Sequence, residues 1–313
     1  MADGHTSQDT AEHSDKLHEF LDTTLSNPPG DARHHFVRCR VTSVEVLADE
    51  LLRVHLHSPA FADLRLTGPD EFFGLIMPTA AHSLDGLENA LADGDRANLR
   101  AVIASCDSAW RPELRWYTFR ALDRENATAC FDVATHGKRT GRESTDDHTF
   151  PAPGLNWVLR AQAGDECAIY ASRGLWHHPS SRQLLIADPS ALPSVWAILE
   201  YCQRFHPDTL RTTRVIALAE TEADIETAAL QQWQNTLASV DVVTGPYAQH
   251  QELLAAHVQE LARQHPEFQP EYLWASGESG MAKTARKLGM TVFGLDSTAI
   301  QWCVYWIAGK PRP

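Results

Sequence analysis

The chain has 313 residues, and its 27 Lys and Arg against 41 Asp and Glu give a formal net charge of −14. A chain this acidic is a poor candidate for binding nucleic acid, because a polyphosphate backbone is bound by clustered Lys and Arg. The hydrophobic fraction of 43% excludes wholesale disorder. At roughly 150 residues per domain, the length favours two domains.

The sequence has no apolar run near the roughly 20 residues of a membrane helix. Its N-terminus is polar and acidic, without the basic and apolar segments of a secretory signal. We therefore expect a cytoplasmic protein with no stable membrane insertion. The cysteines stand singly without a C-x-x-C pair, which argues against a zinc or iron–sulfur site and favours reduced thiols. These are Cys39, Cys106, Cys130, Cys167, Cys202 and Cys303.

Three regions follow one another along the chain. Residues 1–35 are polar and offer little to bury, so we expect a mobile N-terminal extension. Residues 36–173 contain short runs in which apolar and polar residues alternate, as in half-buried antiparallel strands. They predict a small closed barrel of six strands, with the polar stretch Thr79–Asn98 as a surface excursion. The strand candidates lie within 37–46, 52–57, 72–77, 115–122, 129–135 and 166–171.

From residue 174 to residue 313, apolar strand candidates are separated by helical stretches. Such an alternation predicts βαβ units and a parallel sheet. The fold class is thus an antiparallel β-barrel followed by an α/β domain. The strand candidates are 183–187, 213–219, 239–243, 272–275 and 301–307, and the helical stretches are Leu192–Phe205 and Gln251–Gln264.

Two local patterns suggest contacts with a phosphorylated heterocycle. The strand around Arg115, Tyr117 and Thr118 combines a forked phosphate donor, an aromatic plane and a hydroxyl. Gly154 could open a helix whose unpaired backbone N–H groups face an anion. Taken alone, the first pattern is better explained by an amphipathic strand with a solvent-facing arginine, and the second is also explained by a turn before a helix.

Six segments in one order resemble the siderophore-interacting proteins, a flavin-dependent branch of the ferredoxin–NADP⁺ reductase superfamily. The most specific is Arg115-x-Tyr117-Thr118-x-Arg120, which is similar to the family's R-x-Y-T-x-R motif. The likeness extends over about residues 36–313. It implies an FAD-binding barrel followed by an NAD(P)H-binding domain. The other segments are Phe131–Gly137, Pro153–Trp157, Asp188–Pro193, Trp274–Glu278 and Tyr305–Gly309.

The resemblance also implies a role for individual residues. In the barrel, Arg115 would contact the FAD phosphates, Tyr117 would pack on the isoalloxazine, and Thr118, the candidate catalytic residue, would hydrogen-bond near N5. Backbone N–H groups would hold the pyrophosphate at Gly154, Leu155 and Asn156, and the flavin would be lined by Ala134, Thr135 and His136. The nicotinamide site would be bordered by Asp188, Ser190 and Ala191 and closed by Gly277 and Glu278.

The sequence departs from the family pattern at several positions. Leu155 stands where a small residue usually bonds a phosphate oxygen, and Pro189 replaces an acidic residue. Gly74 stands where the family usually has a lysine that would help to hold an anionic ferric chelate. Replacement charge could come from four cations, which are equally well explained as ordinary surface residues. They are Lys138, Arg139, Arg142 and Lys310.

The resemblance implies a ferric-siderophore reductase that passes electrons from NAD(P)H through FAD to Fe(III) and releases Fe(II) for iron uptake. Glu220 follows the second parallel strand, where a carboxylate could bond a ribose hydroxyl and repel a 2′-phosphate, so it slightly favours NADH over NADPH. Three alternatives stay open: a non-catalytic siderophore-binding protein, a flavin reductase with another acceptor, and an external ferredoxin as the electron donor.

Removal of residues 1–31 is expected to leave folding and reduction intact, because this segment offers little apolar surface to the core. Thermal melting, flavin content and turnover of the shortened chain are compared with those of the full chain. Precipitation or loss of flavin in the shortened chain would contradict the expectation of a dispensable extension.

Overall fold

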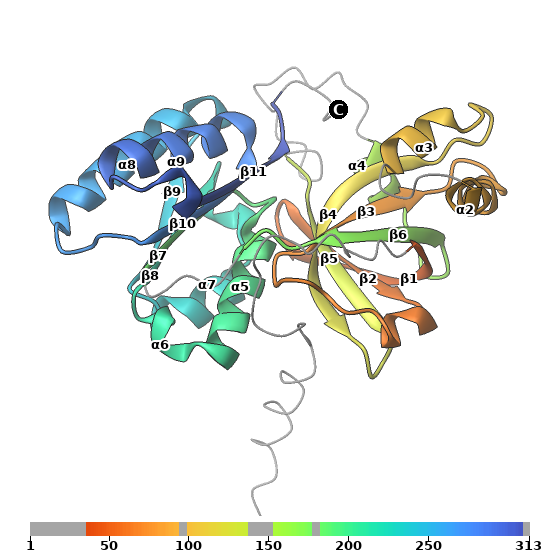
Figure 1. The fold of residues 1–313 in the computed structure, drawn as a ribbon, viewed down its shortest axis with the longest axis horizontal. Coiled ribbons are helices and arrows are strands. Elements are labelled where there is room, and N and C mark those ends of the chain that lie inside the picture. The colour runs from red at the N-terminus through yellow and green to blue at the C-terminus, as the bar shows by residue number, and fades with distance from the viewer. Residues whose placement is uncertain (1–35, 94–98, 137–152, 177–181, 309–313) are drawn as a thin grey trace, which may run out of the picture.

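The computed structural model describes residues 36–93, 99–136, 153–176 and 182–308 (Figure 1). The predicted N-terminal extension therefore lies outside the described residues. A β-barrel occupies the right of the view and a helix-covered sheet the left. Within the described part of the chain, no helix has both the length and the apolar character to cross a membrane.

The first part of the chain is a closed barrel with the strand order β1-β2-β5-β4-β3-β6, in which every pairing is antiparallel. It confirms the predicted six-stranded architecture. Alternate side chains fill the barrel, and Phe73 lies 4.4 Å from Phe119 and 5.4 Å from Phe131 between ring centroids. The strands are β1 (Phe36–Ala48), β2 (Leu51–His57), β3 (Phe72–Met77), β4 (Glu113–Asp123), β5 (Thr128–Ala134) and β6 (Glu166–Arg173).

The stretch Thr79–Asn98 contains a helix with a buried face, where the sequence predicts a polar surface excursion. Helix α2 (Ser83–Asp93) buries Leu84, Leu87 and Leu91 against α3 (Leu99–Ser105) and the outside of the barrel. These leucines recur at helical spacing and form a single apolar stripe. The polar residues between these leucines make the average composition of the stretch polar, so the stripe is visible only from the helical spacing.

The second part of the chain is a parallel five-stranded sheet with the order β11-β10-β7-β8-β9. This confirms the predicted parallel sheet. Helices α5–α7 pack on one face, and α8 and α9 pack on the other (Figure 1). The strands are β7 (Gln183–Ala187), β8 (Thr213–Ala219), β9 (Ser239–Thr244), β10 (Tyr272–Glu278) and β11 (Ile300–Trp306). The helices are α5 (Leu192–Phe205), α6 (Pro207–Leu210), α7 (Thr227–Gln234), α8 (His250–Gln264) and α9 (Ser279–Val292).

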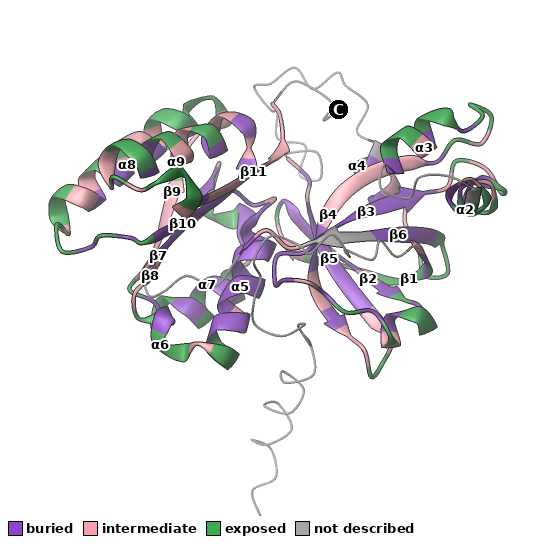
Figure 2. Ribbon diagram, in the orientation of Figure 1, coloured by how far each residue is buried: buried purple, intermediate pink, exposed green. Residues whose placement is uncertain are grey.

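Barrel and sheet are joined by buried polar contacts. Figure 2 shows α5 as largely buried, and its Glu200 accepts two hydrogen bonds, at 2.8 and 2.5 Å, from Arg120 of β4. The carboxylate of Asp70 is fully buried and accepts from the backbone of Trp176 and from Nε1 of Trp274, at 2.9 to 3.0 Å. These contacts fix the sheet against the barrel. The predicted domain boundary near residue 174 stays a prediction.

Glu71 gives the fold a pH dependence. It is 1% exposed, and burial raises the pKa of its carboxyl group from 4.5 to about 7. Between these values the folded chain keeps a proton that the unfolded chain releases, so the free energy of unfolding falls as pH rises. Over the whole window the loss is on the order of 3 kcal/mol.

The variant Glu71→Gln is expected to lose this part of the pH dependence, because an amide does not titrate. Denaturant unfolding between pH 4.5 and pH 7.5 measures it, with the exposed Glu125→Gln as the control. Equal slopes of unfolding free energy against pH in the wild type and Glu71→Gln would refute the assignment.

Candidate functional site

Strand β4 presents two of the predicted flavin contacts directly to the start of α4 (Pro153–Val158). A Cβ atom added at Gly154 would lie 2.7 Å from Cγ of Arg115 and 2.8 Å from the phenol oxygen of Tyr117. Both distances are shorter than real Cβ contacts, so this close approach requires glycine. The structure thus brings Gly154 against Tyr117 and Arg115, which precede it by 37 and 39 residues in the sequence.

Arg115 is partly exposed, and Tyr117 has a neutral phenol. The Arg115 side chain is 34% exposed, donates to the carbonyl of Leu114 at 2.6 Å and lies 3.6 Å from Glu113. A guanidinium has five N–H donors, so these contacts use only some of them. Burial raises the pKa of Tyr117 to about 12, which keeps its phenol neutral and restricts it to packing and hydrogen bonding.

The first turn of α4 contributes backbone donors and an anchor. The early N–H groups of a helix have no acceptor within the helix, and those of Gly154, Leu155 and Asn156 lie in this turn. The Leu155 side chain is 8% exposed and belongs to the barrel core. Leucine at this position therefore fixes α4 on the barrel and leaves only its backbone to meet a phosphate. Together with Arg115, this donor set fits a flavin pyrophosphate.

Three residues at the end of β5, Ala134, Thr135 and His136, are predicted to line the flavin. Ala134 ends the strand, and the hydroxyl of the fully buried Thr135 donates to the carboxylate of Glu50. His136 has a φ of 50°, in the left-handed region. The described contacts of Thr135 thus lie within the barrel, and His136 turns toward the sheet.

The ring of His136 joins a cluster of aromatic side chains between barrel and sheet. Its centroid lies 4.3 Å from Trp306 on β11, and its Nδ1 lies 3.3 Å from the phenol oxygen of Tyr247. Burial, followed by the carboxylates of Asp188 and Glu220, raises the pKa of Tyr247. Glu220 is half-buried directly after β8, close enough to influence this phenol.

Asp188 holds the ends of three parallel strands together. Its buried carboxylate accepts from the backbone N–H and hydroxyl of Ser190 at 2.9 and 2.5 Å, from the backbone of Glu278 at 2.7 Å and from Nε1 of Trp306 at 2.8 Å. Ala191 follows as a buried residue before α5. The predicted nicotinamide border thus lies at the carboxyl edge of the sheet, where α/β folds bind ligands.

Gly277 and Glu278 complete this edge. Gly277 has a φ of 142°, and an added Cβ would lie 2.6 Å from the carboxylate carbon of Asp188. The carboxylate of Glu278 accepts from the backbone of Gly280 and Met281 at the start of α9. Glycine is required here because the chain passes in contact with the Asp188 carboxylate.

Thr118 points to the sheet, and its two polar neighbours are absent from the predicted site. It accepts from the hydroxyl of Ser194 at 3.0 Å and donates to the phenol of Tyr305 at 3.3 Å. Both neighbours adjoin or lie in segments that carry the family resemblance. The sequence gives no signal that they meet, because Tyr305 lies 187 residues from Thr118.

The predicted chelate-binding cations Lys138, Arg139, Arg142 and Lys310 lie outside the described residues. The position of the family lysine is occupied by Gly74 on β3, beneath α3. An added Cβ there would lie 2.6 Å from Cδ1 of Leu114 and 3.3 Å from Cδ2 of Leu99. Leu99 and Leu114 cover this position, so a lysine would require them to move.

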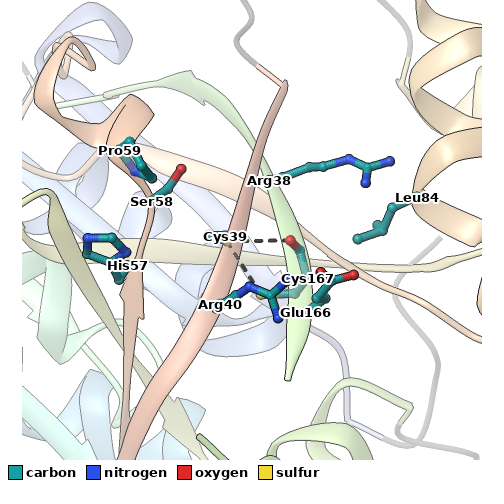
Figure 3. Close-up of a pocket in the computed structure, with 9 residues that line it drawn as sticks. All are labelled: Arg38, Cys39, Arg40, His57, Ser58, Pro59, Leu84, Glu166 and Cys167. Carbon is teal, nitrogen blue, oxygen red and sulfur yellow. Dashed lines mark hydrogen bonds and ion pairs between the residues drawn. The ribbon is translucent and has the colours of Figure 1, made fainter. Parts of the chain in front are cut away.

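A separate pocket of about 410 Å³ opens on the barrel (Figure 3). Its arginines are already paired, Arg38 with Asp85 and Glu88, and Arg40 with Glu166. No cluster of three or more metal-ligating side chains occurs in the described ranges. The pocket is lined by Arg38, Cys39, Arg40, His57, Ser58, Pro59, Leu84, Glu166 and Cys167.

The two cysteines of this pocket are neighbours in space although they stand singly in the sequence. Cys39 and Cys167 face each other across β1 and β6, with their sulfur atoms 3.4 Å apart. Both are buried, and all six cysteines of the chain are free thiols. Their contact contributes to the packing of the barrel core.

Comparison with solved structures finds the same fold. The siderophore-interacting protein SipS from Aeromonas hydrophila has a TM-score of 0.64 at 21% identity, over 89% of this chain and 94% of that chain. A siderophore utilization protein from T. fusca has a TM-score of 0.57 at 21% identity, over 89% and 95%.

Ferredoxin–NADP⁺ reductase from Plasmodium falciparum has a TM-score of 0.60 at 11% identity, over 86% of this chain and 96% of that chain. At these identities the likenesses show the fold alone. A comparison with curated protein sequences finds no match.

Family models match both parts of the chain. The siderophore-interacting FAD-binding domain matches residues 40–176, and the siderophore-interacting protein model matches residues 180–309. The matches include the barrel with its β4–α4 contact and the sheet with its Asp188 edge. The chain therefore belongs to the siderophore-interacting protein family, with a siderophore-interacting FAD-binding domain as its first part and an overall fold like that of ferredoxin–NADP⁺ reductase.

Proposed function

We propose that the chain is a cytoplasmic ferric-siderophore reductase that uses NAD(P)H as electron source and FAD as carrier. The observation that carries the proposal is the contact of Gly154 with Arg115 and Tyr117. It puts a partly exposed guanidinium, a neutral phenol and the donors of a helix start in one place on an FAD-binding family domain.

A bound flavin supplies a carrier that accepts two electrons together and passes them on singly, which suits a two-electron donor and a one-electron acceptor. The chain's task is to hold and orient this group. Arg115 and the α4 backbone bind phosphate, Tyr117 provides a flat neutral surface, and Thr118 offers a hydroxyl near N5. No side chain needs to act as a general acid or base in the electron transfer.

Iron chemistry explains why reduction releases the metal. Fe(III) is a hard cation that siderophores hold through oxygen donors, and Fe(II) binds such donors much less tightly. One NAD(P)H supplies two electrons and therefore reduces two Fe(III) ions. We propose that the anionic ferric chelate is bound by the cations Lys138, Arg139, Arg142 and Lys310.

An anaerobic assay with a ferrous trap tests the whole reaction. Purified protein with bound FAD is mixed with a ferric siderophore and, in separate runs, with NADH, NADPH or reduced ferredoxin. We expect two Fe(II) per nicotinamide oxidised. A colourless protein that binds ferric chelates without reducing them would favour a carrier, and turnover of a quinone or free flavin alone would favour another acceptor.

The variant Arg115→Ala is expected to weaken FAD binding about 10- to 150-fold, because a charged hydrogen bond to phosphate contributes roughly 1.5–3 kcal/mol. Fluorescence titration of flavin-free protein with FAD measures the dissociation constant. Arg40→Ala, on the same barrel but paired with Glu166, serves as the matched control. Equal affinity of Arg115→Ala and the wild type would show that Arg115 does not bind the phosphates.

The variant Glu220→Gln is expected to reduce a preference for NADH, because the amide no longer repels a 2′-phosphate. The ratio of kcat/KM for NADH and NADPH measures the preference, and Glu222→Gln, exposed in the same loop, is the control. A strong NADPH preference in the wild type would contradict the proposed role of Glu220.

A further inference from the structure

Three hydroxyl groups from three separate elements meet where the barrel touches the sheet. Thr118 lies on β4, Ser194 on α5 and Tyr305 on β11. The Ser194 oxygen is 3.0 Å from that of Thr118 and 3.0 Å from that of Tyr305, and the Thr118 and Tyr305 oxygens are 3.3 Å apart. Ser194 is fully buried and Thr118 is 5% exposed, so bulk water does not compete for these two hydroxyls, and Tyr305 is half-buried.

The three protons of this group can be assigned by counting. Each hydroxyl has one proton to donate and can accept as well. Ser194 donates to Thr118, and Thr118 donates to Tyr305. The third contact can then run from Tyr305 to Ser194, because either atom there is able to donate. Among these three contacts the result is a closed ring, in which every hydroxyl donates once and accepts once.

This ring opens most easily at Thr118. If the Thr118 proton turns away from Tyr305, only the longest of the three contacts, at 3.3 Å, is lost. Tyr305 still donates to Ser194, and Ser194 still donates to Thr118. Such a chain makes the Thr118 hydroxyl a stronger donor, because each hydrogen bond polarises the next. Burial raises the pKa of Tyr305, which keeps the phenol protonated and able to start the chain.

We propose that Ser194 is a positioning residue that directs the Thr118 hydroxyl toward the N5 region of a bound flavin, with Tyr305 as the competing acceptor. The inference rests on the proposed function, in which FAD binds beside β4. Ser194 supplies the proton that Thr118 accepts and so leaves the proton of Thr118 available. Tyr305 has the opposite effect when it accepts that proton.

The two neighbours therefore have effects of opposite sign. In Ser194→Ala, Thr118 loses its donor and keeps Tyr305 as acceptor, so we expect FAD affinity to fall about fivefold, the effect of one hydrogen bond. In Tyr305→Phe, the Thr118 proton loses its acceptor in the protein, so we expect affinity to be equal to or higher than that of the wild type. Fluorescence titration of flavin-free protein measures both.

Two further readouts separate positioning from a purely structural role. The visible absorption spectrum of bound FAD in Ser194→Ala should approach that of Thr118→Val, which lacks the hydroxyl. In the Thr118→Val background, Ser194→Ala should change the dissociation constant less than twofold, because the coupling runs through Thr118. Ser194→Cys, whose thiol is larger but donates only weakly, should lower affinity in the same direction even if Ser194→Ala fails to fold.

Equal losses in Ser194→Ala and Tyr305→Phe, or a Ser194→Ala effect that persists in Thr118→Val, would overturn the inference and leave the ring as a joint between barrel and sheet. In that case, wild-type protein would still bind FAD in an Arg115-dependent way. If the wild type bound no FAD, the proposed function would fail as well, so the two failures are distinguishable.

Discussion

The alternation of side chains along β4 is the constraint on which the site depends. Successive residues of a strand face opposite sides, so Arg115 and Tyr117 meet α4, whereas Thr118 and Arg120 meet the second part of the chain. The paired hydrogen bonds of Arg120 to Glu200 hold α5 against this strand. A single strand thus links the proposed cofactor contacts to the joint between barrel and sheet.

Two buried aspartates add further contacts, one within the sheet and one between barrel and sheet. A carboxylate in a dry interior needs several donors, and Asp188 and Asp70 obtain them from segments far apart in the sequence. Asp188 gathers the carboxyl ends of β7, β10 and β11, and Asp70 ties the barrel to β10. Asp188 thereby organises the edge where a nucleotide is proposed to bind.

Most of the fold was predictable because local patterns determine it. The strand Gln183–Ala187 and the helix Leu192–Phe205 have the predicted bounds, since a short apolar run and a long helical period are each clear within one window. In the surface stretch that begins at Thr79, the sequence analysis missed helix α2, because its three buried leucines are spread among polar residues. There the helical spacing, rather than the average polarity, carried the information.

The site was predictable only in part. The family pattern indicated Arg115, Tyr117 and Gly154, whose contact the structure contains. The hydroxyl ring was not predicted, because its members lie 76 and 187 residues from Thr118 and only the packing of α5 and β11 on the barrel brings them together. A pattern within one segment of the sequence cannot predict a contact between three distant segments.

A crystal structure of the protein grown with FAD tests the central claim most directly. We expect the pyrophosphate within hydrogen-bond distance of Arg115 and of the first backbone N–H groups of α4, with the ring system against Tyr117. A pyrophosphate bound away from both Arg115 and α4, at any other place on the chain, would contradict the proposed flavin site.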